Sequence, residues 1–309
     1  MLPHPAADWK RCAARQREMI GLPSGKAANG ETITNGMSVD VEEWFQVGAF
    51  EHTIDKGDWE SLESRVIYNT SAVLDLFAEC GVSATFFTLG WVGARHPALV
   101  RRIAEGGHEV ASHGWDHQRV FTMSSAQFRD DLRRARAALE DAGGVKVTGY
   151  RAPSFSIDAR TPWAHPVLAE EGYDYSSSVA PVAHDHYGWR DSPRFAWRPL
   201  RDSSLIELPV SVAEVGGRRM AVGGGFFRLL PAALTDVAVR QSNAAGRAGM
   251  FYFHPWEVDT GQPRVANAPL RSRLRHYSRI GAMKGKLRGL LGRHQWGRVD
   301  EVAARETCQ

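Results

Sequence analysis

The feature that most constrains the fold of this chain is a repeated alternation of short apolar segments with helical patterns. Seven segments have the apolar or alternating composition of β-strands. They are residues 37–41, 82–89, 108–113, 145–150, 173–178, 205–212 and 249–255. Helical patterns separate most of them. Strands that alternate with helices usually run parallel, so the pattern predicts an α/β fold with a largely parallel sheet, and about seven repeats suit a barrel.

Three of the helical patterns carry end signals. Apolar residues spaced for one helix face begin at residue 66 and stop at Gly81, because glycine commonly ends helices. A second helix opens at Pro97 and ends at the next pair of glycines. Ser124 and Gln127 have the spacing of a capping box, which predicts the start of a third helix that ends at the glycine pair 143–144.

The length of 309 residues allows one large domain or two small ones. Residues 1–35 are rich in Ala, Gly, Pro and charge, which predicts a mobile N-terminal extension. We expect the folded domain at 36–295 and a C-terminal tail at 296–309. The first 35 residues show no secretory signal, and the longest apolar stretch, residues 83–94, is too short to span a membrane. These observations lead us to expect a cytoplasmic protein without a transmembrane segment.

The charge is nearly balanced, because 38 basic and 35 acidic residues give a net charge of +3. This balance argues against nucleic acid as a partner. Basic residues are dense only between Arg271 and Arg293. We interpret that stretch as a solvated helix face in preference to a membrane or polyanion patch.

Three carboxylates, Asp40, Glu42 and Glu43, lie at the carboxyl end of the first predicted strand. The carboxyl ends of parallel strands form the edge where α/β folds build their sites, so a functional role is one interpretation. Acidic residues after a strand also serve as loop solvation or as helix N-caps. The segment alone leaves both interpretations open.

His113 and His117 lie four positions apart in a turn that follows another predicted strand. Two imidazoles in such a turn can converge on one cation, although a chain with 12 histidines can also place two at this spacing by chance. Two imidazole nitrogens and one carboxylate would leave coordination positions open for water and substrate, as in a catalytic metal site.

Two further polar residues lie at the ends of predicted strands. Arg151 stands in Tyr150–Ser154, and His254 stands in Phe253–Glu257. Each has an ordinary structural interpretation, because an arginine pairs with any buried carboxylate and a histidine before proline is commonly packed and hydrogen-bonded.

Taken in order, the four segments resemble the polysaccharide deacetylases of the NodB-homology type, which include chitin and peptidoglycan deacetylases. Within that family, the run from Ser38 to about Tyr277 is most similar to the exopolysaccharide-associated branch that is often found beside exosortase genes. The phrases that carry the resemblance are Ser38–Val47, Ala84–Phe87, Gly107–Gly114, Gly149–Ile157, Gly223–Arg228 and Phe251–Val258.

The resemblance implies a distorted barrel of about seven strand-helix units and one divalent metal ion, for which we expect zinc. The first motif of the family usually has two adjacent aspartates, a general base and a metal ligand. Here the match is Asp40-Val41-Glu42, so Asp40 takes the base role and Glu42 the ligand role, with Glu43 as the other candidate. His113 and His117 match the two histidine ligands of the second motif.

The remaining motifs imply further roles by the same resemblance. Arg151 matches the arginine that holds the base carboxylate, and His254 matches the catalytic acid. The fourth motif is poorly matched, and Asp174 or Trp189 could supply part of it.

The implied reaction is removal of N-acetyl groups from amino sugars of a bacterial exopolysaccharide or its precursor. An N-acetylated polysaccharide or oligosaccharide is the expected partner, together with an association with exopolysaccharide assembly machinery. Two alternatives stay open. One is a related metal amidohydrolase that acts on a small amide. The other is a catalytically silent polysaccharide-binding protein, which the glutamate at a metal position suggests.

Overall fold

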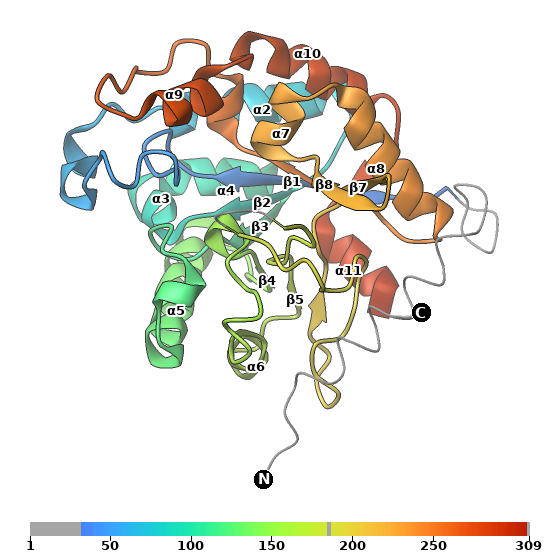
Figure 1. Cartoon of the computed structure of the whole chain (residues 1–309). Helices are drawn as coiled ribbons and strands as arrows, with labels where there is room; N and C mark the ends of the chain where they lie inside the picture. The colour runs from blue at the N-terminus through green and yellow to red at the C-terminus, as the bar shows by residue number, and fades with distance from the viewer. Residues whose placement is uncertain (1–31, 184–186, 308–309) are drawn as a thin grey trace.

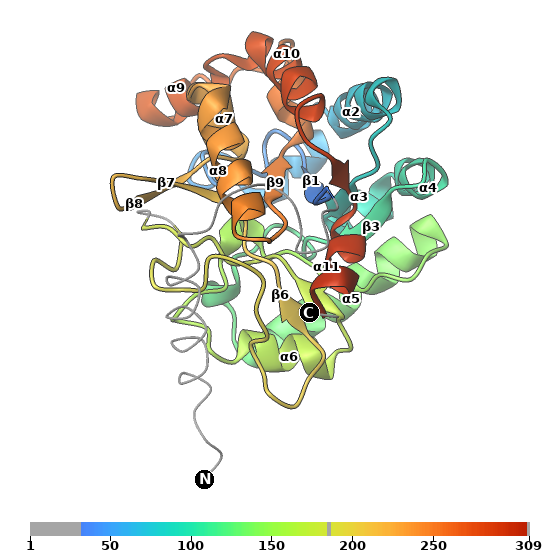
Figure 2. The same cartoon turned by 90° about the vertical axis from the view of Figure 1, so that its right-hand side faces the viewer.

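The structure, a computed structural model, describes residues 32–183 and 187–307. A curved parallel sheet occupies the middle of the molecule, and helices surround it (Figures 1 and 2). The expected N-terminal extension lies almost entirely outside the described residues. The first strand begins at Asn35, two residues before the predicted start.

The main sheet has eight parallel strands, including the short β10 (Trp296–Gly297), which pairs with the start of β1. The other seven follow the order β9-β1-β2-β3-β4-β5-β6. Each lies within or overlaps one of the seven predicted segments. Their bounds are β1 Asn35–Val41, β2 Thr85–Thr88, β3 Glu109–Ser112, β4 Gly149–Tyr150, β5 Tyr175–Ser176, β6 Ile206–Glu207 and β9 Met250–Phe253. Between β6 and β9 the described residues form a backbone contact in place of a strand ladder, in which Ser211 N donates to Met250 O at 2.9 Å. The predicted distorted barrel is therefore confirmed, with its irregularity at this seam.

The register of the strands brings their carboxyl ends to one edge. Asp40 of β1 pairs with Phe87 of β2, and Phe87 pairs with Ala111 of β3. Ser112 then pairs with Tyr150 of β4. Residues that follow these strands therefore enter the same region of the molecule, although they lie far apart in the sequence.

The three predicted helices are confirmed together with their end signals. Helix α2 (Val66–Cys80) ends at Gly81, whose φ of 64° is left-handed. Helix α5 (Ser125–Gly143) begins at a complete capping box between Ser124 and Gln127. The other helices are η3 Lys56–Ser61, α3 Gly90–Arg95, α4 Pro97–Glu105, η4 Val120–Thr122, η5 Pro153–Phe155, α6 Ala164–Glu170, α7 Gly224–Leu229, α8 Ala232–Ala244, η6 Pro255–Val258, α9 Leu270–Tyr277, α10 Ile280–Leu291 and α11 Val299–Thr307. No helix among the described residues is long and apolar enough to cross a bilayer.

The expected C-terminal tail at 296–309 is wrong for residues 296–307, which are part of the fold. Residues 296–297 form β10 (Trp296–Gly297), which pairs with the start of β1. Helix α11 follows and buries Val299 and Val302 in a cluster with residues of the sheet. Val299 N donates to Thr85 Oγ1 at 2.7 Å, so a strand residue satisfies the first N–H of the helix. Burial of apolar side chains that the linear pattern did not reveal explains the difference.

A second feature that we did not predict is an antiparallel hairpin of β7 (Val212–Val215) and β8 (Arg218–Ala221). Its two-residue turn, Gly216-Gly217, has φ of 57° and 73°. Both values lie in the left-handed region that such a turn requires and that glycine adopts without strain.

The contact between β3 and α11 generates a prediction about pH. The Glu109 carboxylate accepts hydrogen bonds from the Tyr175 hydroxyl at 2.8 Å and from Asp300 N at 3.2 Å. Burial and the nearby charge of Asp300 raise the pKa of Glu109 to about 8, from an ordinary value of 4.5. The folded state thus binds this proton more tightly than the unfolded state does. We therefore expect Glu109 to lower the free energy of unfolding as pH rises from about 4.5 to about 8.

The test compares the wild type with Glu109→Gln by urea unfolding between pH 5.5 and 8.5. The free energy of unfolding of the wild type should fall relative to that of the variant, by at most about 1.4 kcal/mol per pH unit. The matched control is Glu105→Gln, which changes an exposed glutamate on the neighbouring helix. Parallel pH profiles for the wild type and Glu109→Gln would refute the prediction.

Candidate active site

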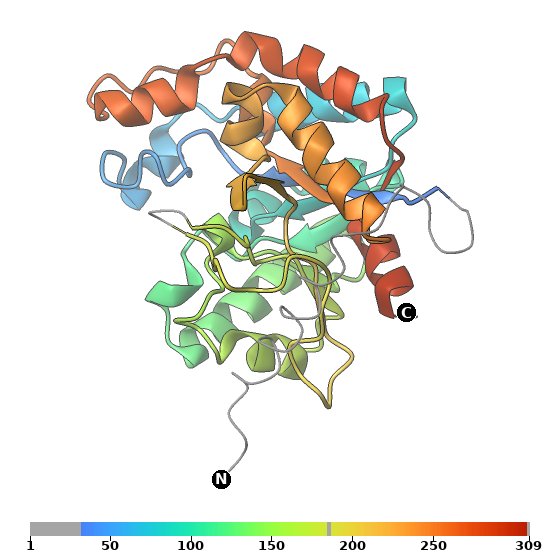
Figure 3. The ribbon, with the colours of Figure 1, turned by 45° about the vertical axis from the view of Figure 1, so that its right-hand side comes forward.

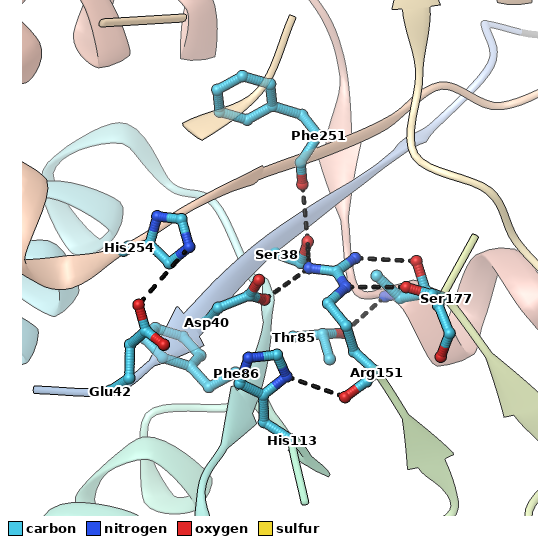
Figure 4. A network of polar contacts seen from close by, with 12 residues as sticks. Ser38, Asp40, Glu42, Thr85, Phe86, His113, Arg151, Ser177, Phe251 and His254 are labelled. Atoms are coloured by element: carbon cyan, nitrogen blue, oxygen red, sulfur yellow. Dashed lines mark hydrogen bonds and ion pairs between the residues drawn. The ribbon is translucent and has the colours of Figure 1, made fainter. Parts of the chain in front are cut away.

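A buried ion pair joins the first strand to the fourth. Arg151, which is fully buried, donates from Nη1 to Asp40 Oδ1 at 2.7 Å and to Ser38 Oγ at 2.7 Å. Its Nε and Nη2 donate to the carbonyl and hydroxyl oxygens of Ser177. Ser38 Oγ in turn donates to Phe251 O on β9 at 2.7 Å (Figure 4). The guanidinium therefore fixes the Asp40 carboxylate with respect to β1, β4, β9 and the chain after β5.

Glu42 and Glu43 point to different surroundings, which separates their roles. Glu42 Oε1 accepts a hydrogen bond from Trp256 Nε1 at 3.0 Å, and its Oε2 lies 2.9 Å from His117 Nε2. Glu43 instead accepts from Arg65 N at 3.0 Å and from the hydroxyl of Ser64, at the start of α2. Glu42 thus faces the histidines, whereas Glu43 caps a helix.

The second motif presents its two histidines from a tight loop after β3. Gly114 has a φ of 76° and His117 a φ of 62°, so a non-glycine residue adopts the left-handed conformation here. Asp131 on α5 holds the loop by accepting from Trp115 N at 3.1 and 3.2 Å. Such a strained residue requires support from its surroundings, and the strain here aims an imidazole at Glu42.

Glu42, His113 and His117 fit a small metal ion. Their ligand atoms all lie within 4.8 Å of one another. The Nδ1–H of His113 donates to Arg151 O at 2.9 Å, which leaves Nε2 as the atom with a lone pair. Glu42 Oε2 is buried without a hydrogen-bond partner, because the approach of His117 lacks hydrogen-bond geometry. A cation would satisfy this buried oxygen.

The protonation of two of these groups suits a metal ligand. Burial lowers the pKa of His113 to about 4, so its imidazole is neutral at ordinary pH. Burial alone would raise the pKa of Glu42, but the adjacent His117 and, more weakly, His254 and His113 outweigh it and lower the pKa to about 2. The carboxylate is therefore ionised.

His254 pairs with a carboxylate that sequence reasoning missed. Its Nδ1 lies 3.0 Å from Glu257 Oε2, and its backbone N–H donates to the same oxygen at 3.0 Å. Burial alone would lower the pKa of His254, but Glu257 and Glu42 outweigh it and raise the pKa to about 9. The spacing of three residues in His254-Pro-Trp-Glu257, which suits a capping contact, is the signal that could have revealed this partner.

A stack of rings continues the wall behind His254. Trp256 stacks on His254 at 5.1 Å and on His276 of α9 at 4.3 Å between ring centroids. The buried Arg228 donates to the carbonyl oxygens of Arg275 and His276. Its Nε lies 3.6 Å from Glu257 Oε1. The histidine is thus held by an aromatic stack and a second buried charge pair.

These residues surround a cavity of about 180 Å³. It is lined by Asp40, Glu42, His113, His117 and His254, and Arg151 lies behind Asp40 without reaching it. Ser154 and Phe155, which have φ of 54° and 49°, form part of the opposite wall. All six residues that the sequence placed in the site therefore gather at one cavity or directly behind it.

Neither of the two candidates for the fourth motif lies at the cavity. Asp174 is exposed at the start of β5, the strand end opposite to the cavity. Trp189 packs with its ring 6.3 Å from that of Trp197. Neither is among the described residues that line the cavity, and Glu257 supplies the carboxylate beside His254.

Comparison with known families divides the chain into two parts. The sequence profile of the polysaccharide deacetylase family matches residues 51–175, and that of a domain of unknown function, DUF3473, matches residues 177–304. The first range contains His113, His117 and Arg151, and the second contains His254. Asp40 and Glu42 precede both.

Two characterised relatives align with part of the chain. It is 37% identical over 89 residues to peptidoglycan-N-acetylglucosamine deacetylase PgdA of Listeria monocytogenes, an alignment that covers 29% of this chain and 19% of the relative. It is 32% identical over 143 residues to a chitooligosaccharide deacetylase of Bradyrhizobium, which covers 46% of this chain and 59% of the relative. The alignments thus span less than two thirds of either relative.

The fold extends the likeness to almost the whole chain. A Mycobacterium smegmatis crystal structure described as a polysaccharide deacetylase has a TM-score of 0.62 at 21% identity, covering 92% of this chain and 91% of that one. The allantoinase Puue has a TM-score of 0.55 at 15% identity, covering 91% and 96%. These two show a shared fold alone. The profile match assigns residues 51–175 to the polysaccharide deacetylase family.

Proposed function

We propose that this protein is a metal-dependent deacetylase that hydrolyses the N-acetyl group of an amino sugar and releases acetate. The observation that carries the proposal is one cavity that contains an arginine-held Asp40, a carboxylate-held His254 and a ligand set for a metal. The match of residues 51–175 to the polysaccharide deacetylase family supports the class of reaction. The relatives named above, which are deacetylases of peptidoglycan and chitooligosaccharide, support an N-acetylated glycan as the substrate.

The metal that we propose is zinc, held by Glu42, His113 and His117, because two imidazoles and a carboxylate are common ligands of catalytic zinc. Such an ion would polarise the acetamide carbonyl and make the attacking water more acidic. The substitution of glutamate for aspartate does not by itself suggest a silent binding protein, since the longer side chain brings Oε2 within 2.9 Å of His117 Nε2.

The protein side chains supply the proton transfers. The water oxygen attacks the carbonyl carbon while Asp40 takes a proton from the water. Arg151 offsets the negative charge of this buried base. His254 then gives a proton to the sugar nitrogen as the C–N bond breaks, which yields acetate and a free amine. Its pKa of about 9 keeps His254 protonated at neutral pH, and Glu257 fixes the orientation of the ring.

We further propose an exopolysaccharide or its precursor as the natural substrate, with an association with the assembly machinery of that polymer. The support is the resemblance carried by the phrases Gly223–Arg228 and Phe251–Val258. In the structure both phrases contribute to the cavity, through Gly225 and Arg228 and through Tyr252, His254 and Trp256. All five of these residues come from the DUF3473 range, so that range contributes to the wall that a polymer would contact.

The different surroundings of Glu42 and Glu43 predict different effects on metal content. Glu42→Gln replaces an anionic ligand by a neutral amide. We expect zinc affinity to fall at least roughly tenfold to a hundredfold, which is the loss seen when a residue that only hydrogen-bonds a ligand is removed. Glu43→Gln is the matched control. It should retain about one zinc per chain and lower the melting temperature, because it weakens the cap of α2.

Metal analysis by mass spectrometry after dialysis against a zinc buffer measures the difference. His113→Ala serves as a second ligand variant. Loss of zinc in Glu43→Gln with retention in Glu42→Gln would reverse the assignment of the carboxylate ligand.

The base assignment predicts that Asp40→Asn abolishes turnover while zinc still binds. Because a positioned general base contributes about 10²–10⁴-fold to a rate, acetate release from N-acetylglucosamine oligomers should fall by a similar factor. Asp259→Asn is the control, since Asp259 forms a buried pair with Arg65 but does not line the cavity. Activity of Asp40→Asn within tenfold of wild type would end the base assignment. Absence of acetate release by the zinc-loaded wild type from all such oligomers would overturn the proposed substrate class.

A further inference from the structure

The basic charge of this protein is concentrated in one segment. Between Asp259 and Asp300 the chain has no acidic residue, and it carries ten Lys and Arg residues there. The whole chain has a net charge of +3, so the remainder carries −7. This segment forms the loop before α9, then α9 and α10, which lie in the upper helical layer of Figure 1.

Several of these cations have structural partners. Lys286 donates to the carbonyl oxygens of Phe227, Arg228 and Leu230. Arg288 pairs with Glu79 on α2, and Arg298 pairs with Asp300. Among the described residues, these contacts account for three of the ten charges, and the first two bind α10 to its neighbours.

The charges on α9 are different, because they face solvent. Arg271, Arg273 and Arg275 are all exposed, and none of them forms an ion pair with a described carboxylate. The two leucines of the same helix are also exposed. Leu270 keeps 67% and Leu274 57% of its surface in contact with water, one helical turn apart. Exposed leucines thus lie among the arginines of the solvated helix face that we expected from the sequence.

The position of α9 connects this surface to the candidate active site. The helix lies at the outer edge of the molecule in both views (Figures 1 and 3). Its last turn contributes Arg275 and His276 to the cavity, and His276 stacks on Trp256. Leu274 therefore directly precedes a residue that lines the cavity, and Leu270 lies one turn further along the helix.

We propose that α9 docks the protein on the surface of a lipid bilayer that contains anionic phospholipids. Arginines would contact the phosphate groups, and Leu270 and Leu274 would enter the boundary between headgroups and acyl chains. An anionic soluble glycan would complement the arginines but offers no apolar layer to cover two leucines, so the charge and the exposed side chains together favour a membrane. Docking would bring the cavity to the membrane surface.

The test measures flotation of the full-length protein with vesicles and needs no substrate, so it is independent of the proposed deacetylase activity. The vesicles are pure phosphatidylcholine or a 7:3 mixture with phosphatidylglycerol, in about 0.1 M and 0.5 M salt. We expect binding to the anionic vesicles at low salt, with much weaker binding to neutral vesicles and at high salt. No flotation of the wild type with anionic vesicles would overturn the proposal.

Two double variants locate the surface. Arg271→Gln with Arg273→Gln should weaken partitioning roughly 25-fold, because each basic residue near an anionic surface contributes about fivefold. Leu270→Gln with Leu274→Gln should weaken it roughly tenfold or more, since partial burial of each leucine is lost. The matched control, Val215→Gln with Arg218→Gln, changes an exposed apolar residue and an exposed arginine on the β7–β8 hairpin and should bind like the wild type. Equal binding by the α9 variants and the control would contradict α9 as the docking element.

Discussion

The contact on which the rest of the site depends is the buried pair of Arg151 and Asp40. Burying a guanidinium and a carboxylate is costly unless their hydrogen bonds are completed, and here Ser38 and Ser177 complete those of the arginine. The backbone carbonyl of the same Arg151 accepts from His113 and so fixes which ring nitrogen faces the metal position. One residue therefore orients both the proposed base and a proposed ligand, and it connects the strands that bring them together.

The sequence predicted most of this fold because its signals are local. Each of the seven strands and the caps at Ser124, Gly81 and Gly144 follow from nearest-neighbour patterns. Prediction failed where burial depends on distant contacts. The segment 296–307 has few strong local signals, and it is ordered by pairing with β1 and by packing against the sheet.

The site was predicted with a similar division. The family resemblance implied the six residues around the cavity. The sequence next to Glu42 and Glu43 did not show which of the two faces the histidines. The choice depends on Ser64 and Arg65, which lie about 20 residues away and occupy Glu43. The sequence analysis named no partner for His254, and the structure places one, Glu257, three residues downstream. A capping geometry in η6 positions this carboxylate.

This local pairing changes how the acid side of the site is built. Because Glu257 and Trp256 belong to the same short turn as His254, the ring, its carboxylate and its stacking partner move as one unit. That unit is anchored from outside by Arg228 and His276, on α7 and α9. The base side depends instead on hydrogen bonds between strands of the barrel. A change in the position of α9 would therefore shift His254 through the stacked rings of His276 and Trp256, without involving Asp40. The surface helix is thus coupled by direct contacts to the proposed acid.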